Sequence, residues 1–110
     1  MRTSIILTAL LIGACSPSGK FDSDQWKDAD PLTRDRVEMV DQLLSQHPLK
    51  GLSRSEVVEL LGEPTSTDKW DDWDMMYVLG PTDYMPIDNE WLVINLNAAG
   101  RVVAYKKTQD

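Results

Sequence analysis

The chain contains very few of the residues that bind metals or form disulfides. It has one cysteine and one histidine among 110 residues. A structural zinc site takes four ligands, mostly Cys and His, and an internal disulfide needs two cysteines. The sequence therefore predicts no metal, no cofactor and no internal cross-link. We expect the single histidine, His47, to occupy a surface or helix-end position.

Basic residues are also scarce. Lys and Arg number 11 against 18 Asp and Glu, which gives a formal net charge of −7. Proteins that bind nucleic acid need clustered Lys and Arg to neutralise phosphates. We therefore expect no nucleic-acid partner, and no attraction to anionic lipid headgroups.

No apolar run is long enough to span a membrane. The N-terminal run at residues 5–12 is about half of the roughly 20 residues that a spanning helix needs. Arg2 precedes this run, and Gly13 and Ala14 follow it, which is the order of the parts of a signal peptide. Residues 1–14 are therefore predicted to be a signal peptide, and its removal takes away Arg2 and moves the net charge from −7 to −8.

Cys15 directly follows this segment, and four roles are open to it: structural thiol, nucleophile, half of an intermolecular disulfide, or attachment point. Residues 16–19 offer no group that would lower its pKa, and the chain has no second cysteine. The sequence "IGAC" resembles the bacterial lipobox, which implies a lipidated Cys15 as the mature N-terminus. Ser16 in place of Asp implies anchoring at the outer membrane, facing the periplasm.

Domain organisation is predicted from composition. Residues 15–30 are rich in Ser, Pro, Gly, Lys and Asp, which is typical of a flexible tether. Residues 31–110 are long enough for one small core, and they show no internal repeat. We expect a signal peptide at 1–14, a tether at 15–30 and a single domain at 31–110.

The first predicted helix runs from residue 31 to His47. Asp30 can cap it, Pro31 suits its first position, and apolar residues recur at helical spacing until Pro48 ends it.

The second predicted helix, at residues 54–61, has signals at both ends. Ser53 and Glu56 have the spacing of a capping box. Gly62 can take the left-handed conformation at the end of the helix, and Pro64 prevents its continuation.

Beyond this helix the apolar pattern alternates, as in strands. Strands are predicted at 74–80, 90–96 and 101–107, with a hairpin at Gly100 between the last two. The predicted fold class is therefore α+β, with two N-terminal helices packed on one face of a three-stranded antiparallel meander.

Parts of residues 50–107 resemble the BamE (SmpA/OmlA) family. The matching residues are Gly51-Leu52-Ser53, Val57, Leu61, Gly62 and Pro64 in the helical segment, and Tyr77, Leu92 to Leu96 and Gly100-Arg101-Val102 in the strands. The resemblance implies an αα-βββ lipoprotein that serves as an accessory of outer-membrane protein assembly. The chain departs from the best-known member in a longer first helix and in the loop "STDKWDDWD".

Two functions follow as hypotheses. The first is a lipid-anchored periplasmic module that binds another envelope protein. The second is a tethered enzyme inhibitor or ligand-binding sensor, because the architecture also resembles the repeat unit of the β-lactamase inhibitory protein. An enzyme is not expected, since no nucleophile, base or metal set accompanies the carboxylates.

The loops contain an acidic cluster, which is considered as a calcium site, and an aromatic cluster, which could bind a partner. Asp68, Asp71, Asp72 and Asp74 lack the spacing of a calcium loop, so they are interpreted as a solvated acidic loop. The candidate interaction surface contains Trp, Tyr and Met, residue types that are over-represented at interfaces. Its residues are Trp70, Trp73, Tyr84 and Met85, with burial in the small core as the alternative, favoured for Trp73 and for Trp91 on the neighbouring strand.

Overall fold

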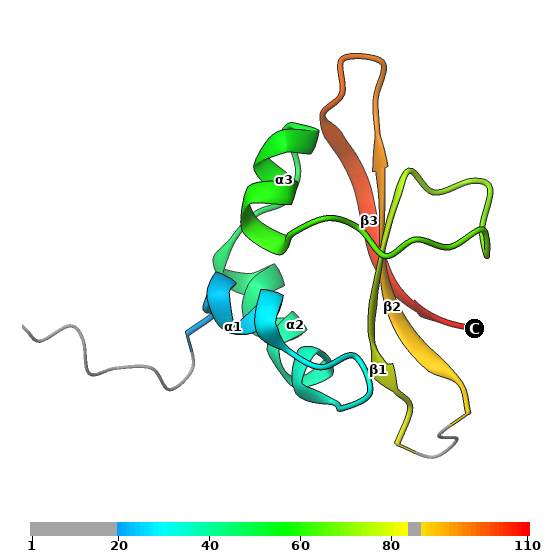
Figure 1. Ribbon diagram of the computed structural model, residues 1–110. Coiled ribbons are helices and arrows are strands. Elements are labelled where there is room, and N and C mark those ends of the chain that lie inside the picture. Colours follow the sequence, from blue (N-terminus) through cyan, green and yellow to red (C-terminus); the bar gives the residue numbers. More distant parts are fainter. Residues whose placement is uncertain (1–19, 84–86) are drawn as a thin grey trace, which may run out of the picture.

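Helices precede strands along the chain, as predicted. The computed structural model describes residues 20–83 and 87–110. Within these ranges the helices are α1 (Ser23–Asp28), α2 (Asp35–Gln46) and α3 (Arg54–Leu61), and the strands are β1 (Met75–Pro81), β2 (Asn89–Leu96) and β3 (Val102–Gln109). Figure 1 shows the helices on one side of the sheet and the loop between α3 and β1 on the other.

The sheet is an antiparallel meander in the order β1-β2-β3. Tyr77 of β1 lies opposite Leu92 of β2, and Ile94 of β2 lies opposite Tyr105 of β3. Gly100 has φ +78° in the hairpin between β2 and β3. The mixed α+β class and the antiparallel meander are therefore confirmed.

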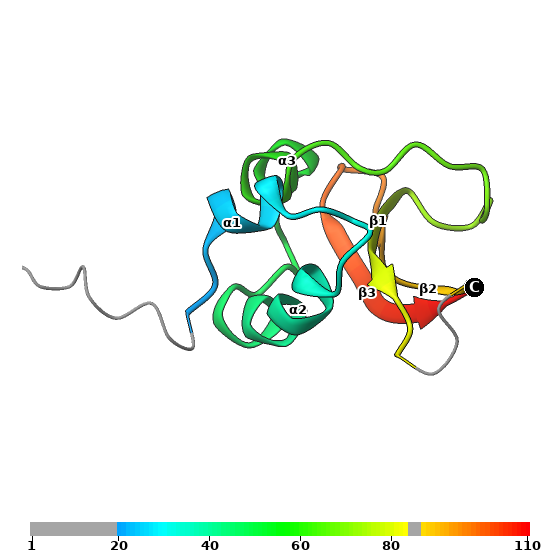
Figure 2. The same cartoon turned by 60° about the horizontal axis from the view of Figure 1, so that its bottom comes forward.

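Alternation along β2 gives the sheet two different faces. Leu92 and Ile94 belong to the core beneath the helices, whereas Trp91 and Val93 belong to a second cluster on the opposite face. This division follows from the alternation along the strand, because successive strand side chains point to opposite faces. Figure 2 shows the same layering from a second direction.

Helix α3 is the element in which sequence and structure agree most closely. The Glu56 amide donates to Ser53 Oγ at 3.2 Å, and the Ser53 amide donates to Glu56 Oε1 at 2.8 Å, which completes the capping box. Gly62 follows the helix with φ +83°. The Ser53 hydrogen bonds lower the pKa of Glu56 below its ordinary value, because they stabilise the carboxylate.

Helix α2 begins later than predicted, at Asp35 in place of residue 31. The Asp30 carboxylate accepts from the Leu32 amide at 2.9 Å, and the Asp30 carbonyl accepts from the Thr33 amide at 3.0 Å. Asp therefore stabilises a local turn here and not a helix start, because its side chain competes for nearby backbone donors.

The prediction of a flexible tether through residue 30 is wrong for its described part, and α1 is a helix that the sequence analysis did not predict. Asp22 caps α1 by accepting from the amides of Asp24 at 2.9 Å and Gln25 at 3.2 Å. The side chain of Trp26 is 0% exposed and belongs to the main core. One indole buries enough apolar area to order a short segment that is otherwise polar. The folded part therefore starts about ten residues before the predicted boundary at residue 31.

The segment between α1 and α2 closes against the end of β1. A Cβ atom at Gly80 would lie 2.2 Å from the Thr33 carbonyl oxygen, and Gly80 has φ +145°. Arg34 Nη1 donates to the Pro81 carbonyl at 2.5 Å and pairs with Glu90 at 3.2 Å. Only glycine permits this close approach, which joins the helical layer to the sheet edge.

Candidate functional site

The predicted site residues fall into two groups. Cys15, Tyr84 and Met85 lie outside the described residues. Trp70 and Trp73 lie in the loop between α3 and β1, where both are partly buried against the second face of the sheet. The structure therefore gives these two indoles a packing role, as the alternative interpretation held for Trp73.

Trp70 is fixed by contacts on both sides. Its ring meets Trp91 of β2 edge to face, with centroids 5.4 Å apart. Lys69 Nζ lies 6.0 Å from the Trp70 ring centroid and pairs with the Asp110 carboxylate at 3.0 Å. The aromatic pair thereby ties the loop to β2, and the ion pair ties it to Asp110, the residue that follows β3.

The Asp110 carboxylate accepts hydrogen bonds from two donors. The Asn89 amide donates to Asp110 Oδ1 at 2.6 Å, and Lys69 is the second donor. Burial acts to raise the pKa of Asp110, but these two donors outweigh it, and the pKa lies below its ordinary value. The carboxylate is therefore charged at neutral pH, which maintains its ion pair with Lys69 of the loop.

Trp73 lies at the other end of the same loop. Lys106 of β3 places its Nζ 5.6 Å from the Trp73 ring centroid, within the range of a cation–π contact. Next to it, Asp74 Oδ2 accepts from the Leu96 amide at 2.7 Å. Asp74 is therefore a structural residue that fastens the loop to β2.

Two exposed apolar side chains were not identified from the sequence. Leu32 and Ile87 are each 84% exposed. Leu32 lies in the α1–α2 segment beside the contact of Thr33 with Gly80, and Ile87 lies in the β1–β2 loop beyond the hydrogen bond from the Thr82 amide to the Asp88 carbonyl. Both are therefore at the end of the molecule that holds the β1–β2 loop. Ile87 lies two residues after Met85 in sequence. This closeness to a predicted interaction residue was the signal that could have identified it.

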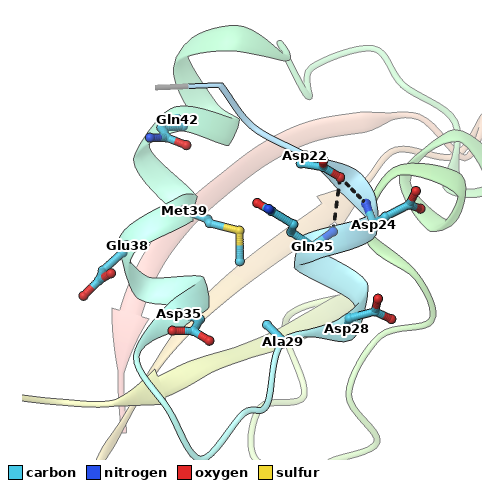
Figure 3. Close-up of a pocket in the computed structure, with 9 residues that line it drawn as sticks. All are labelled: Asp22, Asp24, Gln25, Asp28, Ala29, Asp35, Glu38, Met39 and Gln42. Carbon is cyan, nitrogen blue, oxygen red and sulfur yellow. Dashed lines mark hydrogen bonds between the residues drawn. The ribbon is translucent and has the colours of Figure 1, made fainter. Parts of the chain in front are cut away.

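An acidic groove of about 600 Å³ lies between α1 and α2. Figure 3 shows Met39 of α2 directed toward Gln25 of α1 in its floor. The carboxylates that line the groove are those of Asp22, Asp24, Asp28, Asp35 and Glu38. The groove was not predicted from the sequence, because residues 15–30, which include α1, were expected to form a tether.

The carboxylates of the groove diverge. In Figure 3 the side chains of Asp24 and Glu38 point away from the groove on opposite sides. Within residues 20–83 and 87–110, no group of three or more Asp, Glu, His or Cys side chains is placed to hold a metal ion. The groove is therefore a concave surface lined by negatively charged side chains.

His47 lies at the C-terminal end of α2. Its ring meets Phe21 edge to face at a centroid distance of 5.4 Å. A second groove, of about 450 Å³, passes between His47 and Glu59. The predicted helix-end position is thus confirmed, with an aromatic partner that the sequence did not indicate.

The comparisons with known proteins add no relative. No family model matches the chain, and neither a curated protein nor a solved structure matches it. Across the residues that the structure describes, none of the helices has the length and apolar character needed to cross a bilayer. The BamE resemblance and the lipid anchor therefore stay predictions.

Proposed function

We propose that the protein is a lipid-anchored protein-interaction module of the bacterial cell envelope. Cys15 carries the lipid, the outer membrane holds the anchor, and the domain faces the periplasm. The domain has the BamE-like helices-then-meander arrangement with α1 added before it. Its partner is another envelope protein, and its role is that of an accessory in envelope or outer-membrane protein assembly.

The observation that carries this proposal is the meeting of two family-like motifs. The Gly51 amide donates to the Val102 carbonyl at 2.9 Å, and the Val102 amide donates to the Leu52 carbonyl at 2.8 Å. Ser53 and Arg101 form a bridge beside them. The family-like residues that precede α3 therefore pair with the start of β3 along its outer edge. Motif residues far apart in sequence are expected to meet in this way if they define one fold.

A second contact joins the end of α3 to the sheet. The Tyr77 hydroxyl donates to the Gly62 carbonyl at 2.8 Å. Burial raises the pKa of Tyr77 above its ordinary value, so the hydroxyl stays protonated and keeps donating. This contact also joins two residues of the family-like pattern, which supports the same fold assignment.

The surface favours a protein partner. Large exposed apolar groups such as Leu32 and Ile87 are typical of contact sites when they gather at one end of a domain. The groove between α1 and α2 adds a concave acidic surface that a basic segment could enter. These features support binding to another protein.

The anchor is tested by replacing Cys15. We expect Cys15→Ala to abolish palmitate labelling and to move the protein from the membrane to the soluble fraction, whereas Ser18→Ala leaves both unchanged. Labelling and fractionation that do not respond to Cys15→Ala would contradict the anchor.

The partner is tested by a photocrosslinking residue placed at Leu32 or Ile87 in intact cells. Val103, which is exposed on β3, provides the matched control position. Recovery of outer-membrane assembly components from the first two positions, and not from Val103, supports the proposal.

The alternative is a tethered enzyme inhibitor or ligand-binding sensor, and the groove between α1 and α2 favours it because such sites are concave. A crosslinker at Gln42, which lines the groove, distinguishes the two functions. Recovery of one soluble periplasmic enzyme from Gln42 favours the inhibitor, and crosslinks from Leu32 and Ile87 alone favour the assembly module.

A further inference from the structure

The chain enters the folded domain at Phe21, and this entry point is fixed. The Phe21 amide donates to Gln46 Oε1 at 2.9 Å. The Phe21 ring lies 5.8 Å from the ring of Trp26 and 5.4 Å from that of His47, measured between centroids. Residue 21 is therefore held at the C-terminal end of α2.

Helix α1 is held in place by three further contacts. Arg36 Nε donates to the Trp26 carbonyl at 2.9 Å, and its guanidinium lies 5.0 Å from the centroid of the Trp26 ring. The Ser23 hydroxyl donates to the Leu60 carbonyl of α3 at 2.6 Å. Since the Trp26 side chain is fully buried, releasing α1 would open the main core.

These contacts limit how far the domain can move from Cys15. Fully extended chain covers at most about 3.6 Å per residue, so residues 15–21 span about 20 Å at most. A tether that reached to residue 30 would span about 50 Å. The docking of α1 therefore removes more than half of the reach.

We propose that α1 is a latch that holds the anchored domain against the bilayer, with the C-terminal end of α2 facing the lipid surface. This inference rests on the proposed lipid anchor at Cys15. The surface left for a partner protein follows from it: the exposed apolar end with Leu32 and Ile87 faces away from the lipid.

The length of α2 separates the two ends of the domain. Twelve residues at about 1.5 Å each give a helix of about 18 Å. Phe21 and His47 lie at one end of α2, and Leu32 precedes the other end. The anchor therefore draws one end toward the lipid and presents the exposed apolar end outward.

Electrostatics do not hold the domain at the bilayer. The net charge of −8 after loss of Arg2 is repelled by anionic headgroups. The covalent linker alone then sets the distance, so a longer linker lets the domain move away. A domain held by its own lipid-binding surface would be insensitive to linker length.

The test measures energy transfer from a dye on the acylated protein to rhodamine-labelled phosphatidylethanolamine in phosphatidylethanolamine–phosphatidylglycerol vesicles. Because Cys15 is blocked by lipid, Ser45→Cys near the anchored end and Leu32→Cys at the far end each supply a single free thiol. We expect higher transfer from position 45 than from position 32.

A 15-residue Gly/Ser insert between Gly19 and Lys20 adds about 20 Å of root-mean-square span. We expect it to lower transfer from position 45 and to reduce the difference between the two positions. The same 15 residues appended after Asp110 form the matched control and leave both values unchanged.

Equal transfer from positions 45 and 32 in the acylated parent, or no response to the insert, would overturn the latch while leaving the anchor intact. Mass spectrometry of the same preparation checks acylation separately. An unacylated Cys15 would overturn the proposed lipid anchor, and the proposed role of α1, which depends on that anchor, would be overturned as well.

Discussion

The two faces of the sheet are covered by different kinds of structure. On one face, three helices within the described residues pack over Leu92 and Ile94. On the other face, an irregular loop covers Trp91 and Val93 with the half-buried rings of Trp70 and Trp73. The first face is closed by regular elements, and the second by a few side chains.

This difference between the two faces indicates which one contributes more to stability and which one opens more easily. A helical layer buries a continuous apolar face, so removing one large side chain leaves a cavity in a rigid core. A loop held by an aromatic pair and an ion pair opens at lower free energy, because few apolar contacts must be broken. Substitutions on the two faces should therefore differ in their effect on the free energy of unfolding.

The largest effect is expected on the helical face. Trp26→Ala should lower the free energy of unfolding by about 3–5 kcal/mol, because it leaves a cavity where α1 meets the core. Urea unfolding followed by circular dichroism measures this loss, and Trp26→Phe gives a milder variant. Leu32→Ser, at an exposed site, should change stability by less than about 0.5 kcal/mol. A similar loss for both substitutions would mean that α1 is not part of the core.

The next effect concerns the junction of the helical layer with β1. Gly80→Ala should cost about 2–3 kcal/mol, because the new methyl group meets the Thr33 carbonyl and the backbone has positive φ. Gly51→Ala is the matched control, since Gly51 also has positive φ but open space around it, and it should cost about 1–2 kcal/mol. Equal costs in thermal unfolding would contradict the close approach.

The loop face should respond less. Trp70→Ala removes one edge-to-face pair from a partly buried site and should cost about 1–2 kcal/mol. Acrylamide quenching of the remaining tryptophan fluorescence should rise at the same time, because Trp91 loses its cover. A loss as large as that of Trp26→Ala would remove the distinction between the two faces.

The smallest effect is expected at the capping box of α3 and depends on pH. The pKa of Glu56 is lower when folded than the unfolded value of about 4.3, so its contribution is present above that pH and is lost as the pH falls through the folded pKa. Glu56→Gln should therefore flatten the decline in melting temperature below about pH 4.3. Glu59→Gln, in the same helix but outside the capping box, should leave the decline unchanged.

Local signals made α3 and the strands predictable. The capping box at Ser53 and Glu56, and the alternation along β2, act between residues close in sequence, so no other part of the chain is needed to read them. Asp30 misled the prediction of α2, because an Asp can stabilise either a helix start or a turn.

The candidate site was less predictable. Trp70 and Trp73 were identified as interaction residues, yet their burial depends on Trp91 and Met76 of a sheet face that the loop folds over. The acidic groove requires α1, and α1 requires a buried site for Trp26 that only the assembled domain provides. The composition of residues 15–30 is dominated by polar residues, so it did not indicate that the single indole of Trp26 would be buried.

The sequence alone determined the α+β class, the order of its strands, the two ends of α3 and the acidic charge, because each depends on local pattern or composition. Tertiary structure decided that Trp26 anchors a further helix, that an aromatic loop covers the second sheet face, and that Leu32 and Ile87 stay exposed. The physical reason is that burial is a property of packed neighbours. A side chain's neighbours are known only when segments distant in sequence meet.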